Sequence, residues 1–309
     1  MSADNATEPP DQDGLYPIRT VSALTGVNPV TLRAWERRYG LIEPQRTPKG
    51  HRLYTEGDIE RIHRILELLD QGISIGQTRR LIETDAPVQE ASLLQGRDED
   101  AWSPLQRRIS DAVDRLDEAA LSSAYDDALA CHPVSRVHRQ LVLPLSRELA
   151  SRDHDDAMSL AARRFFSAFM RNKLGAQIHH QSDIARGPKI LAACLPGEGI
   201  ETELMLFGVT ALGQGYRLVL LGPDTPVNVA VAASRQCHAR GVALFGEPDA
   251  DTRALEEPLR GAVAEASGPV FVGGGIADSE RARIEARGAT PLPSDSHDAV
   301  RRVQQGLLR

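Results

Sequence analysis

The stretch NPVTLRAWERRYGL, residues 28–41, predicts a short helix with well-defined ends. Asn28 suits the cap of a helix and Pro29 its first turn, and Gly40 is a typical residue at a helix end. Upstream, residues 20–24 predict another helix, and only a few residues separate the two. Two helices joined by such a tight connection indicate a helix-turn-helix, in which the second helix lies in the DNA major groove.

The spacing of side chains in this second helix separates a buried face from a basic one. Leu32 and Trp35 are three residues apart and are expected to face a core. Arg33 and Arg37 are four residues apart, so they share a different face, from which long cationic side chains reach into a major groove. Arg38 continues the basic run and is a further candidate DNA contact. The alternative interpretation is an ordinary solvated face of a helix.

The next segment, RTPKGHRLY at residues 46–54, predicts a wing in the form of a β-hairpin. The Pro-Lys-Gly turn at residues 48–50 lies between short extended pieces and brings basic side chains to the place where the DNA backbone passes. Contacts to phosphates position a protein on a duplex without specifying its bases. The candidate contacts in this segment are Arg46, Lys49, His51, Arg52 and Tyr54.

Positive charge is concentrated in this part of the chain. The whole sequence has a formal net charge of -7, which argues against a protein that coats nucleic acid along its entire surface. Residues 15–83, in contrast, carry about three more basic than acidic side chains. This segregation favours the DNA-binding interpretation over a solvated face.

Length and periodicity predict a multidomain protein of the α and α/β classes, since 309 residues exceed one ordinary domain. From residue 105 apolar residues recur at helical spacing, and after residue 187 short β-like runs alternate with stretches long enough for helices. This alternation predicts a doubly wound parallel sheet. The expected ranges are a disordered tail at 1–14, a winged helix-turn-helix at 15–83, a linker at 84–104, a helical bundle at 105–182 and a Rossmann-like domain at 187–309.

Other features of the sequence exclude several function classes. No apolar run approaches the roughly 20 residues that cross a bilayer, and the acidic start is unlike a signal sequence, so we expect a cytoplasmic protein with no membrane partner. The three cysteines, Cys131, Cys194 and Cys237, are too scattered for a disulfide framework or a zinc site, so we expect buried thiols and no metal. The sequence offers no pairing of a nucleophile with a base and no dinucleotide fingerprint, so we expect no enzymatic activity.

The motifs quoted above closely resemble the DNA-binding domain of the MerR family over about 70 residues. In that family the second helix lies in the major groove and the wing contacts the DNA backbone. NPVTLRAWERRYGL, PQRTPKGHRLY and GDIERI are most similar to the branch that contains the curli regulator MlrA and the cobalamin-binding light sensors CarH and LitR. Metal sensors of the family carry a long dimerisation helix and paired cysteines, which this sequence lacks. The resemblance implies a regulator that binds double-stranded promoter DNA as a homodimer or a higher homo-oligomer.

The C-terminal half resembles the cobalamin-binding module of the light sensors over about 200 residues, but a similar fold does not establish a ligand. PGEGIETE at residues 196–203 corresponds to a loop of that module, and the LGPDTP motif at residues 221–226 is intact. The histidine that coordinates cobalt in the family aligns with Ile200, and a later glycine of the same loop aligns with Glu203. Isoleucine has no lone pair to offer a metal.

Further positions of the cofactor pocket also differ from the family. A Glu-His pair that lies above the cobalamin aligns with Arg163 and Arg164, and a tryptophan position falls near Asp153. Each of these replacements changes the chemistry of the position. The resemblance therefore implies that this module has lost cobalamin, and we expect no cofactor.

Two alternatives stay open for the C-terminal half. A shifted alignment would make His154, His179 or His180 a ligand of cobalamin, although surface histidines explain these residues more simply. The glycine run at 273–275 follows an apparent strand at the edge where doubly wound folds bind ligands, but glycines also permit tight turns and close packing.

We therefore predict a sequence-specific, cobalamin-independent transcription regulator of the MerR type. Its C-terminal module is expected to serve oligomerisation, binding of a signalling-protein partner or sensing of an unidentified effector. The alternative function is a cobalamin-dependent light-sensing repressor, in which light alters the oligomer and releases DNA.

Overall fold

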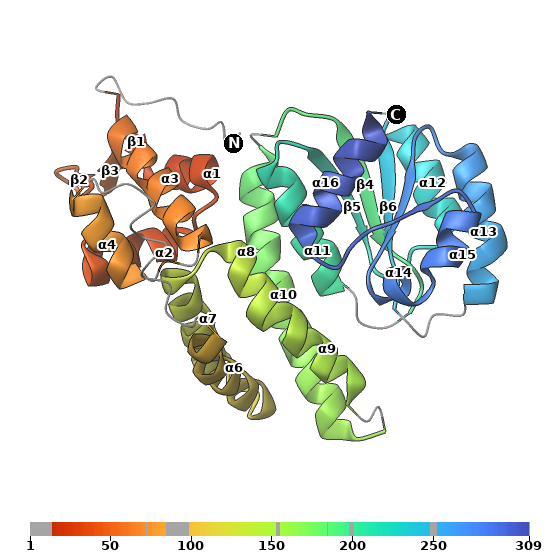
Figure 1. The fold of residues 1–309 in the computed structure, drawn as a ribbon, viewed down its shortest axis with the longest axis horizontal. Coiled ribbons are helices and arrows are strands. Elements are labelled where there is room, and N and C mark those ends of the chain that lie inside the picture. The colour runs from red at the N-terminus through yellow and green to blue at the C-terminus, as the bar shows by residue number, and fades with distance from the viewer. Residues whose placement is uncertain are drawn as a thin grey trace. The chain divides into compact units, whose positions relative to one another are not determined.

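The computed structural model describes residues 14–71, 73, 75–84, 99–152, 155–183, 185–197, 201–247 and 252–308 (Figure 1). Contacts divide the chain into two compact units, residues 1–165 and 166–309. The boundary falls inside helix α10, Ala157–Ser182. The predicted tail, apart from its last residue, and residues 85–98 of the predicted linker lie outside the described part of the chain.

The first unit begins with a winged helix-turn-helix. Its elements are β1 (Tyr16–Pro17), α1 (Ile18–Thr25), α2 (Pro29–Ala34), the π-helical turn η1 (Trp35–Tyr39), β2 (Gln45–Arg46), β3 (Arg52–Tyr54), α3 (Glu56–Asp70) and α4 (Ile75–Thr84). Asn28 accepts a hydrogen bond from Val30 N at 2.9 Å, and Gly40 ends η1 at a φ of 58°, so the predicted helix ends are confirmed. We call α2 and η1 together the recognition helix.

The short strands and α3 complete this fold. β3 lies between β1 and β2 and pairs with both of them in antiparallel fashion. Thr55 starts α3 with a reciprocal cap, because its Oγ1 accepts a hydrogen bond from Asp58 N while Asp58 Oδ2 accepts one from Thr55 N. Apolar side chains of α1, the recognition helix, β3 and α3 form one core, in which Trp35 is 1% exposed and Tyr54 is 0% exposed.

The first unit continues with the helices α6 to α9. They are α6 (Glu99–Asp114), α7 (Glu118–Cys131), α8 (Val134–Val137), the π-helical turn η3 (His138–Val142) and α9 (Leu143–Ser151). α6 begins inside the segment predicted as a linker and runs through Pro104. Trp102 and Ile109 lie two turns apart on α6 and are both buried, so the packing of this face outweighs the backbone hydrogen bond that proline removes. α7 packs against α6 and against the recognition helix.

The second unit contains a parallel sheet, as the alternation of apolar runs predicts. Its strands are β4 (Lys189–Cys194), β5 (Arg217–Gly222), β6 (Gly241–Phe245), β7 (Val270–Gly273) and β8 (Thr290–Pro291). Its helices after α10 are α11 (Glu201–Gly213), α12 (Val227–Gln236), α13 (Thr252–Glu265), α14 (Gly275–Ser279), α15 (Arg281–Ala286) and α16 (Ser296–Leu307). The strand order is β5-β4-β6-β7-β8, and every neighbouring pair is parallel.

Helices cover both faces of this sheet. Side chains along β4 alternate between two cores, since Ile190 and Ala192 pack with residues of α11 and α16, while Leu191 and Ala193 pack with residues of α12 and α13. The fold is therefore doubly wound, as predicted. In a sheet of this order successive strands are added on one side of β4 and then on its other side, next to β6. Ligands of such folds bind beyond the carboxyl ends of these two strands.

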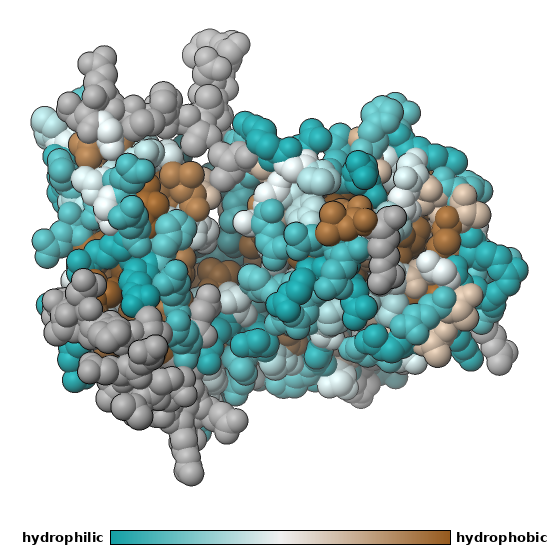
Figure 2. Space-filling model, turned by 45° about the horizontal axis from the view of Figure 1, so that its top comes forward, coloured by the Kyte–Doolittle hydropathy of each residue, from teal (hydrophilic) through white to brown (hydrophobic). Residues whose placement is uncertain are grey.

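Figure 2 shows a face of the molecule whose described surface is mostly hydrophilic, with apolar side chains in small separate groups. Scattered apolar residues are normal on a protein surface. Among the described residues, none of the helices combines the length and the apolar composition needed to cross a bilayer.

Candidate nucleic-acid interface

The recognition helix presents two exposed arginines. Arg33 and Arg37 lie four residues apart on α2 and η1, and both side chains are exposed. Neither has an ion-pair partner within the part of the chain that the structure describes. Leu32, on the opposite side, is fully buried in the core, which fixes the helix with both arginines outward. The predicted split between a buried face and a basic face is therefore present.

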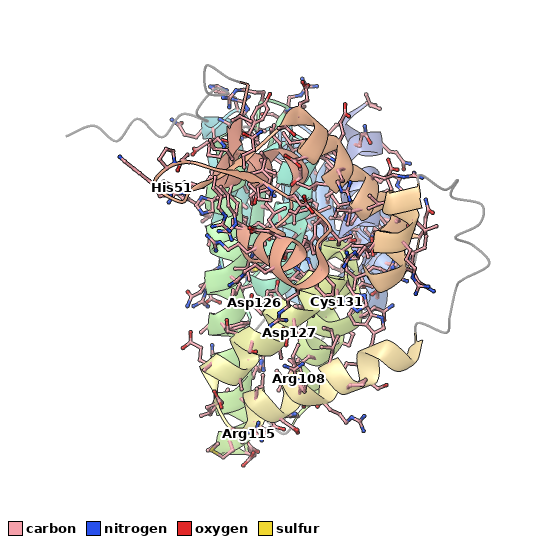
Figure 3. All side chains as sticks on the ribbon, turned by 90° about the vertical axis from the view of Figure 1, so that its left-hand side faces the viewer. His51, Arg108, Arg115, Asp126, Asp127 and Cys131 are labelled. Carbon is pink, nitrogen blue, oxygen red and sulfur yellow. The ribbon has the colours of Figure 1, made fainter. Side chains whose placement is uncertain are left out.

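The tip of the wing presents Lys49 and His51. Gly50 N donates a hydrogen bond to Thr47 O at 2.8 Å, and Thr47 N donates one to His51 O at 2.9 Å, so a tight turn closes the hairpin. Gly50 has a φ of 82°, a conformation that favours glycine. Lys49 and His51 are exposed, and their side chains have no ion-pair partner among the described residues. His51 is labelled on the wing in Figure 3.

Arg46 and Arg52 of the wing are bound to Glu36 of the recognition helix. Arg46 Nη2 donates a hydrogen bond to Glu36 Oε1 at 2.6 Å, and Arg52 Nε donates one to Glu36 Oε2. The side chains of Glu36 and Arg52 are only 16% and 17% exposed. Burial alone would raise the pKa of Glu36, but the hydrogen bonds and charges of the two arginines outweigh burial and hold this pKa below its ordinary value of 4.5. Glu36 therefore joins the recognition helix to the wing.

Tyr54 does not reach the surface, which contradicts the predicted DNA contact of this residue. Its ring lies in the core of the winged helix-turn-helix, and burial raises the pKa of its hydroxyl to about 12. The hydroxyl has no hydrogen-bond partner among the described residues. A side chain with no exposed surface cannot touch a duplex. Arg52 and Tyr54 are two residues apart on β3 and share a face of the strand, and this face turns inward.

Arg38 is held by the helical bundle instead of standing free. Its Nη1 donates a hydrogen bond to Asp127 Oδ1 at 2.8 Å, and Arg108 Nη2 on α6 donates one to Asp127 Oδ2 at 3.0 Å. Figure 3 shows Asp127 and Arg108 where α7 and α6 lie side by side. Burial would raise the pKa of Asp127, but its hydrogen bonds with the two arginines outweigh burial and lower it. The carboxylate is therefore ionised at neutral pH and pairs with both arginines.

The recognition helix also binds the last turn of α7. Thr31 Oγ1 donates a hydrogen bond to Leu129 O at 3.3 Å, and Trp35 Nε1 donates one to Ala130 O at 2.8 Å. Both carbonyls are among the last four of α7, which lack partners inside their own helix. Side chains of the recognition helix thus cap the carboxyl end of α7.

Tyr39 and Cys131 extend this contact. The Tyr39 hydroxyl lies 3.1 Å from Cys131 Sγ. Burial, and to a smaller extent this hydrogen bond, raise the pKa of Tyr39 to about 12. We call the contact of Thr31, Trp35, Arg38 and Tyr39 with α7 the α7 seam.

Three polar residues of this region were not predicted from the sequence: Thr31, Glu36 and Asp127. Glu36 is the one acid in the basic run WERRY, and an acid between arginines is a signal for a local ion pair. Thr31 and Asp127 bind partners 98 and 89 positions away, and no local pattern predicts such contacts.

Small residues at the carboxyl ends of the central strands of the second unit are packed tightly. A Cβ atom on Gly246 would lie 2.9 Å from Ile276 Cγ2 and 3.0 Å from Leu195 Cδ1. A Cβ atom on Gly273 would lie 2.6 Å from Phe245 Cε1. Close-packed interiors do not tolerate carbon contacts this short, so a Cβ atom at either position would force the neighbouring side chains to shift.

Gly274 has a backbone reason as well. Its φ is 81°, and a Cβ atom there would lie 2.6 Å from Gly246 O. Close packing at Gly273 and a left-handed backbone at Gly274 thus account for these two glycines without a phosphate.

Several positions discussed for cobalamin lie outside the described residues or on the surface. Ile200, Asp153 and His154 lie outside the described part of the chain. His179 and His180 are described, and both are exposed on α10. Surface histidines of this kind are ordinary solvated side chains.

The arginines at the two positions of the family's Glu-His pair cannot supply a ligand to cobalt. Arg163 is buried on α10 and Arg164 is exposed there, and a guanidinium does not ligate a metal because it remains protonated. In the second unit Glu203 replaces the glycine of the loop, and the neighbouring Glu201 pairs with Arg171 at 2.7 Å. Among the described residues, no three His, Cys, Asp or Glu side chains come together as a metal site.

Comparisons with known proteins give relatives that cover most of the chain. Residues 16–85 match the family described as MerR HTH family regulatory protein. The chain is 30% identical over 263 residues to the HTH-type transcriptional repressor CarA of Myxococcus xanthus, a match that covers 83% of this chain and 85% of CarA. It is 28% identical over 277 residues to the HTH-type transcriptional repressor CarH of the same organism, covering 87% of this chain and 92% of CarH.

Two further similarities concern one part of the chain and the fold. The HTH-type transcriptional regulator MlrA of Escherichia coli (strain K12) is 48% identical over 71 residues, which are 23% of this chain and 29% of MlrA. The structure of the Methanosarcina barkeri monomethylamine corrinoid protein matches with a TM-score of 0.52 and 13% identity, covering 65% of this chain and 98% of that protein. This likeness is one of fold, and the parallel sheet of the second unit resembles cobalamin-binding Rossmann-like domains.

Proposed function

Because the chain belongs to the MerR HTH family of transcriptional regulators, we propose that it binds a two-fold symmetric promoter site as a homodimer or a higher homo-oligomer. Two recognition helices about one DNA turn apart then read the two half-sites. Arg33 and Arg37 contact bases in the major groove, and Lys49 and His51 bind phosphates of the backbone. The observation that carries this proposal is that all four side chains are exposed and have no ion-pair partner among the described residues.

The paired arginines have different roles in this proposal. Arg52 is mostly buried against Glu36, so it orients the wing. Arg46 is 49% exposed beside the same carboxylate, so it supports the wing and offers its remaining N–H groups to a phosphate. Arg38 binds Asp127 through Nη1, so a phosphate that binds this nitrogen has to displace the carboxylate.

The test begins with selection of bound sequences from a pool of random DNA duplexes, so that the protein itself defines its site. Arg33→Ala and Arg37→Ala are expected to weaken binding to the selected site and to relax its sequence, since each bidentate base contact contributes about 1–3 kcal/mol of discrimination. Lys49→Ala is expected to weaken binding to every sequence and to reduce the salt slope by about 0.9, because it removes a phosphate contact.

Arg260→Ala on α13 is the matched control, since it removes the same charge from an exposed helix of the second unit. It should leave the selected sequence and the salt slope unchanged. If Arg33→Ala and Arg37→Ala both select the native sequence with native affinity, the assignment of the recognition helix is wrong.

For the second unit we propose a role that does not depend on cobalamin. The aliphatic residue Ile200 at the position of the cobalt ligand supports this proposal. The close packing of neighbouring atoms against Gly246, Gly273 and Gly274 supports it as well. The unit then serves self-association, a signalling-protein partner or an effector other than cobalamin. None of these roles requires catalysis.

The visible absorption spectrum tests this proposal. The protein is incubated with adenosylcobalamin in the dark and desalted, and a colourless protein is the expected result. A retained corrinoid spectrum would contradict it and would favour a cobalamin-dependent light-sensing repressor. The intact LGPDTP motif is the feature that speaks for that second function, because Thr225 N donates a hydrogen bond to Cys194 O at 2.9 Å and so holds this loop at the carboxyl end of β4.

A further inference from the structure

The α7 seam places an acidic side chain on a cation of the DNA-reading helix. Arg38 follows Arg37 directly on η1, and its side chain is 64% exposed. Asp127 on α7, 29% exposed, binds it at 2.8 Å. A guanidinium pairs with carboxylates and phosphates through the same planar set of N–H donors, so Asp127 takes the place that a DNA phosphate would take.

Hydrogen bonds outside this ion pair keep α7 in position. Trp35 and Thr31 bind the carbonyls of Ala130 and Leu129, which lie three and two residues beyond Asp127. Both side chains are buried, so they fix the register of α7 against the recognition helix. The position of Asp127 beside Arg38 is therefore built into the packing and does not depend on the ion pair alone.

Arg108 gives Asp127 a second partner. It binds the other carboxylate oxygen at 3.0 Å from α6, the neighbouring helix of the bundle. When Arg38 turns to a phosphate, Asp127 keeps Arg108, so the exchange does not leave an unpaired carboxylate beside the DNA.

We propose that Asp127 competes with DNA phosphate for Arg38, and that α7 thereby sets the affinity of the protein for DNA. In this arrangement the helical bundle acts on the recognition helix directly, through a contact within one compact unit. An effector or partner that shifts α7 changes the availability of Arg38. The proposal extends the DNA-binding function to a residue outside the winged helix-turn-helix.

Asp127→Asn tests the competition, because asparagine keeps the shape of the side chain and removes its charge. The probe is a fluorescently labelled 30-bp duplex of arbitrary sequence, since phosphate contacts do not depend on sequence. Asp127→Asn is expected to tighten binding about two- to five-fold, the range that an exposed ion pair contributes.

Asp126→Asn is the matched control. Asp126 carries the same charge on the same turn of α7 and accepts a hydrogen bond from Ser122 Oγ at 3.5 Å. Its replacement changes the overall charge equally, so any general electrostatic gain appears in both variants and cancels in their ratio. Equal affinities of the two variants would overturn the proposal.

A double-mutant cycle separates competition from a structural role. In an Arg38→Gln background Asp127→Asn should bind DNA no more tightly than Asp126→Asn, because the contested cation is gone. An Asp127→Asn gain that persists there contradicts the proposal. Weaker binding by Asp127→Asn, together with a lower melting temperature, would show that Asp127 only supports the fold.

Thr31→Val provides a second route to the same result, since it keeps the shape of the side chain and removes the hydrogen bond to Leu129 O. A weaker contact at the α7 seam should increase the affinity for DNA, as Asp127→Asn does. These measurements use arbitrary DNA, so they remain interpretable when the selection of a specific site fails.

Discussion

The Glu36 carboxylate accepts a hydrogen bond from Arg52 Nε, and this pair joins the recognition helix to the wing. Both side chains are mostly buried, and Arg46 binds the second carboxylate oxygen. A DNA-binding surface made of two elements needs such a joint, because phosphate contacts of the wing fix the register in which the helix meets the bases.

Glu36→Gln is expected to lower both stability and DNA affinity. The change leaves Arg46 and Arg52 close together without their anion, so the free energy of unfolding should fall by about 1–3 kcal/mol. Affinity should fall because the wing loses its orientation, although the protein becomes more positive. Urea denaturation and fluorescence anisotropy measure the two effects.

Glu43→Gln is the control for that experiment, because Glu43 is exposed just beyond the recognition helix and its replacement changes the net charge equally. It should raise affinity slightly through general electrostatics and leave stability unchanged. If Glu36→Gln binds DNA as tightly as Glu43→Gln, Glu36 does not orient the wing.

Lowering the pH should remove the contribution of Glu36. The pKa of this carboxyl in the folded protein lies below its ordinary value of 4.5, so the stabilisation is fully present above about pH 4.5 and is lost as the pH falls through the folded value. We therefore expect the difference in unfolding free energy between the native protein and Glu36→Gln to shrink over the range below about pH 4.5. Asp127 titrates in both proteins, so its effect cancels. A difference that stays constant over this range refutes the prediction.

Tyr54→Phe should keep DNA affinity and hold or increase stability. The hydroxyl is buried with no hydrogen-bond partner among the described residues. Removing such a group is expected to raise the free energy of unfolding by up to about 1 kcal/mol. Thermal unfolding and anisotropy with arbitrary duplex DNA measure both quantities. A loss of affinity at unchanged stability would restore Tyr54 as a DNA contact.

Gly274→Ala should destabilise the second unit by at least about 2 kcal/mol, since it combines a left-handed backbone with a clash against Gly246 O. Gly261→Ala on α13 is the matched control, because nothing lies within 4 Å of the added Cβ atom. Alanine in an exposed helix is expected to stabilise by about 1 kcal/mol. Chemical denaturation compares the two. Equal stabilities would remove the packing explanation of the glycine run.

Local signals explain what the sequence predicted correctly. The cap at Asn28 and the left-handed Gly40 are properties of one or two residues, so they locate the recognition helix without knowledge of its neighbours. The strands of the second unit are predictable because buried parallel strands appear as continuous apolar runs. Pro104 misled the prediction of α6, because local propensity was outweighed by the burial of Trp102 and Ile109.

Long-range contacts explain what the sequence did not predict. The residues that bind the recognition helix on α7 lie about ninety positions away, and periodicity identifies an apolar face without naming its polar partners. Tyr54 was misplaced for a related reason. A strand of three residues has two faces, and the packing of α3 and the recognition helix decides which one turns inward.

The capped end of α7 bears on how such regulators exchange parts. The side chains of Thr31 and Trp35 donate hydrogen bonds to carbonyls of α7. The packing of the DNA-reading segment therefore extends beyond residue 83. A recombination event that joined residues 14–83 to a different sensor would leave the indole N–H of Trp35 and the last carbonyls of α7 without these partners. A transfer that keeps these two hydrogen bonds has to include α7 together with the winged helix-turn-helix.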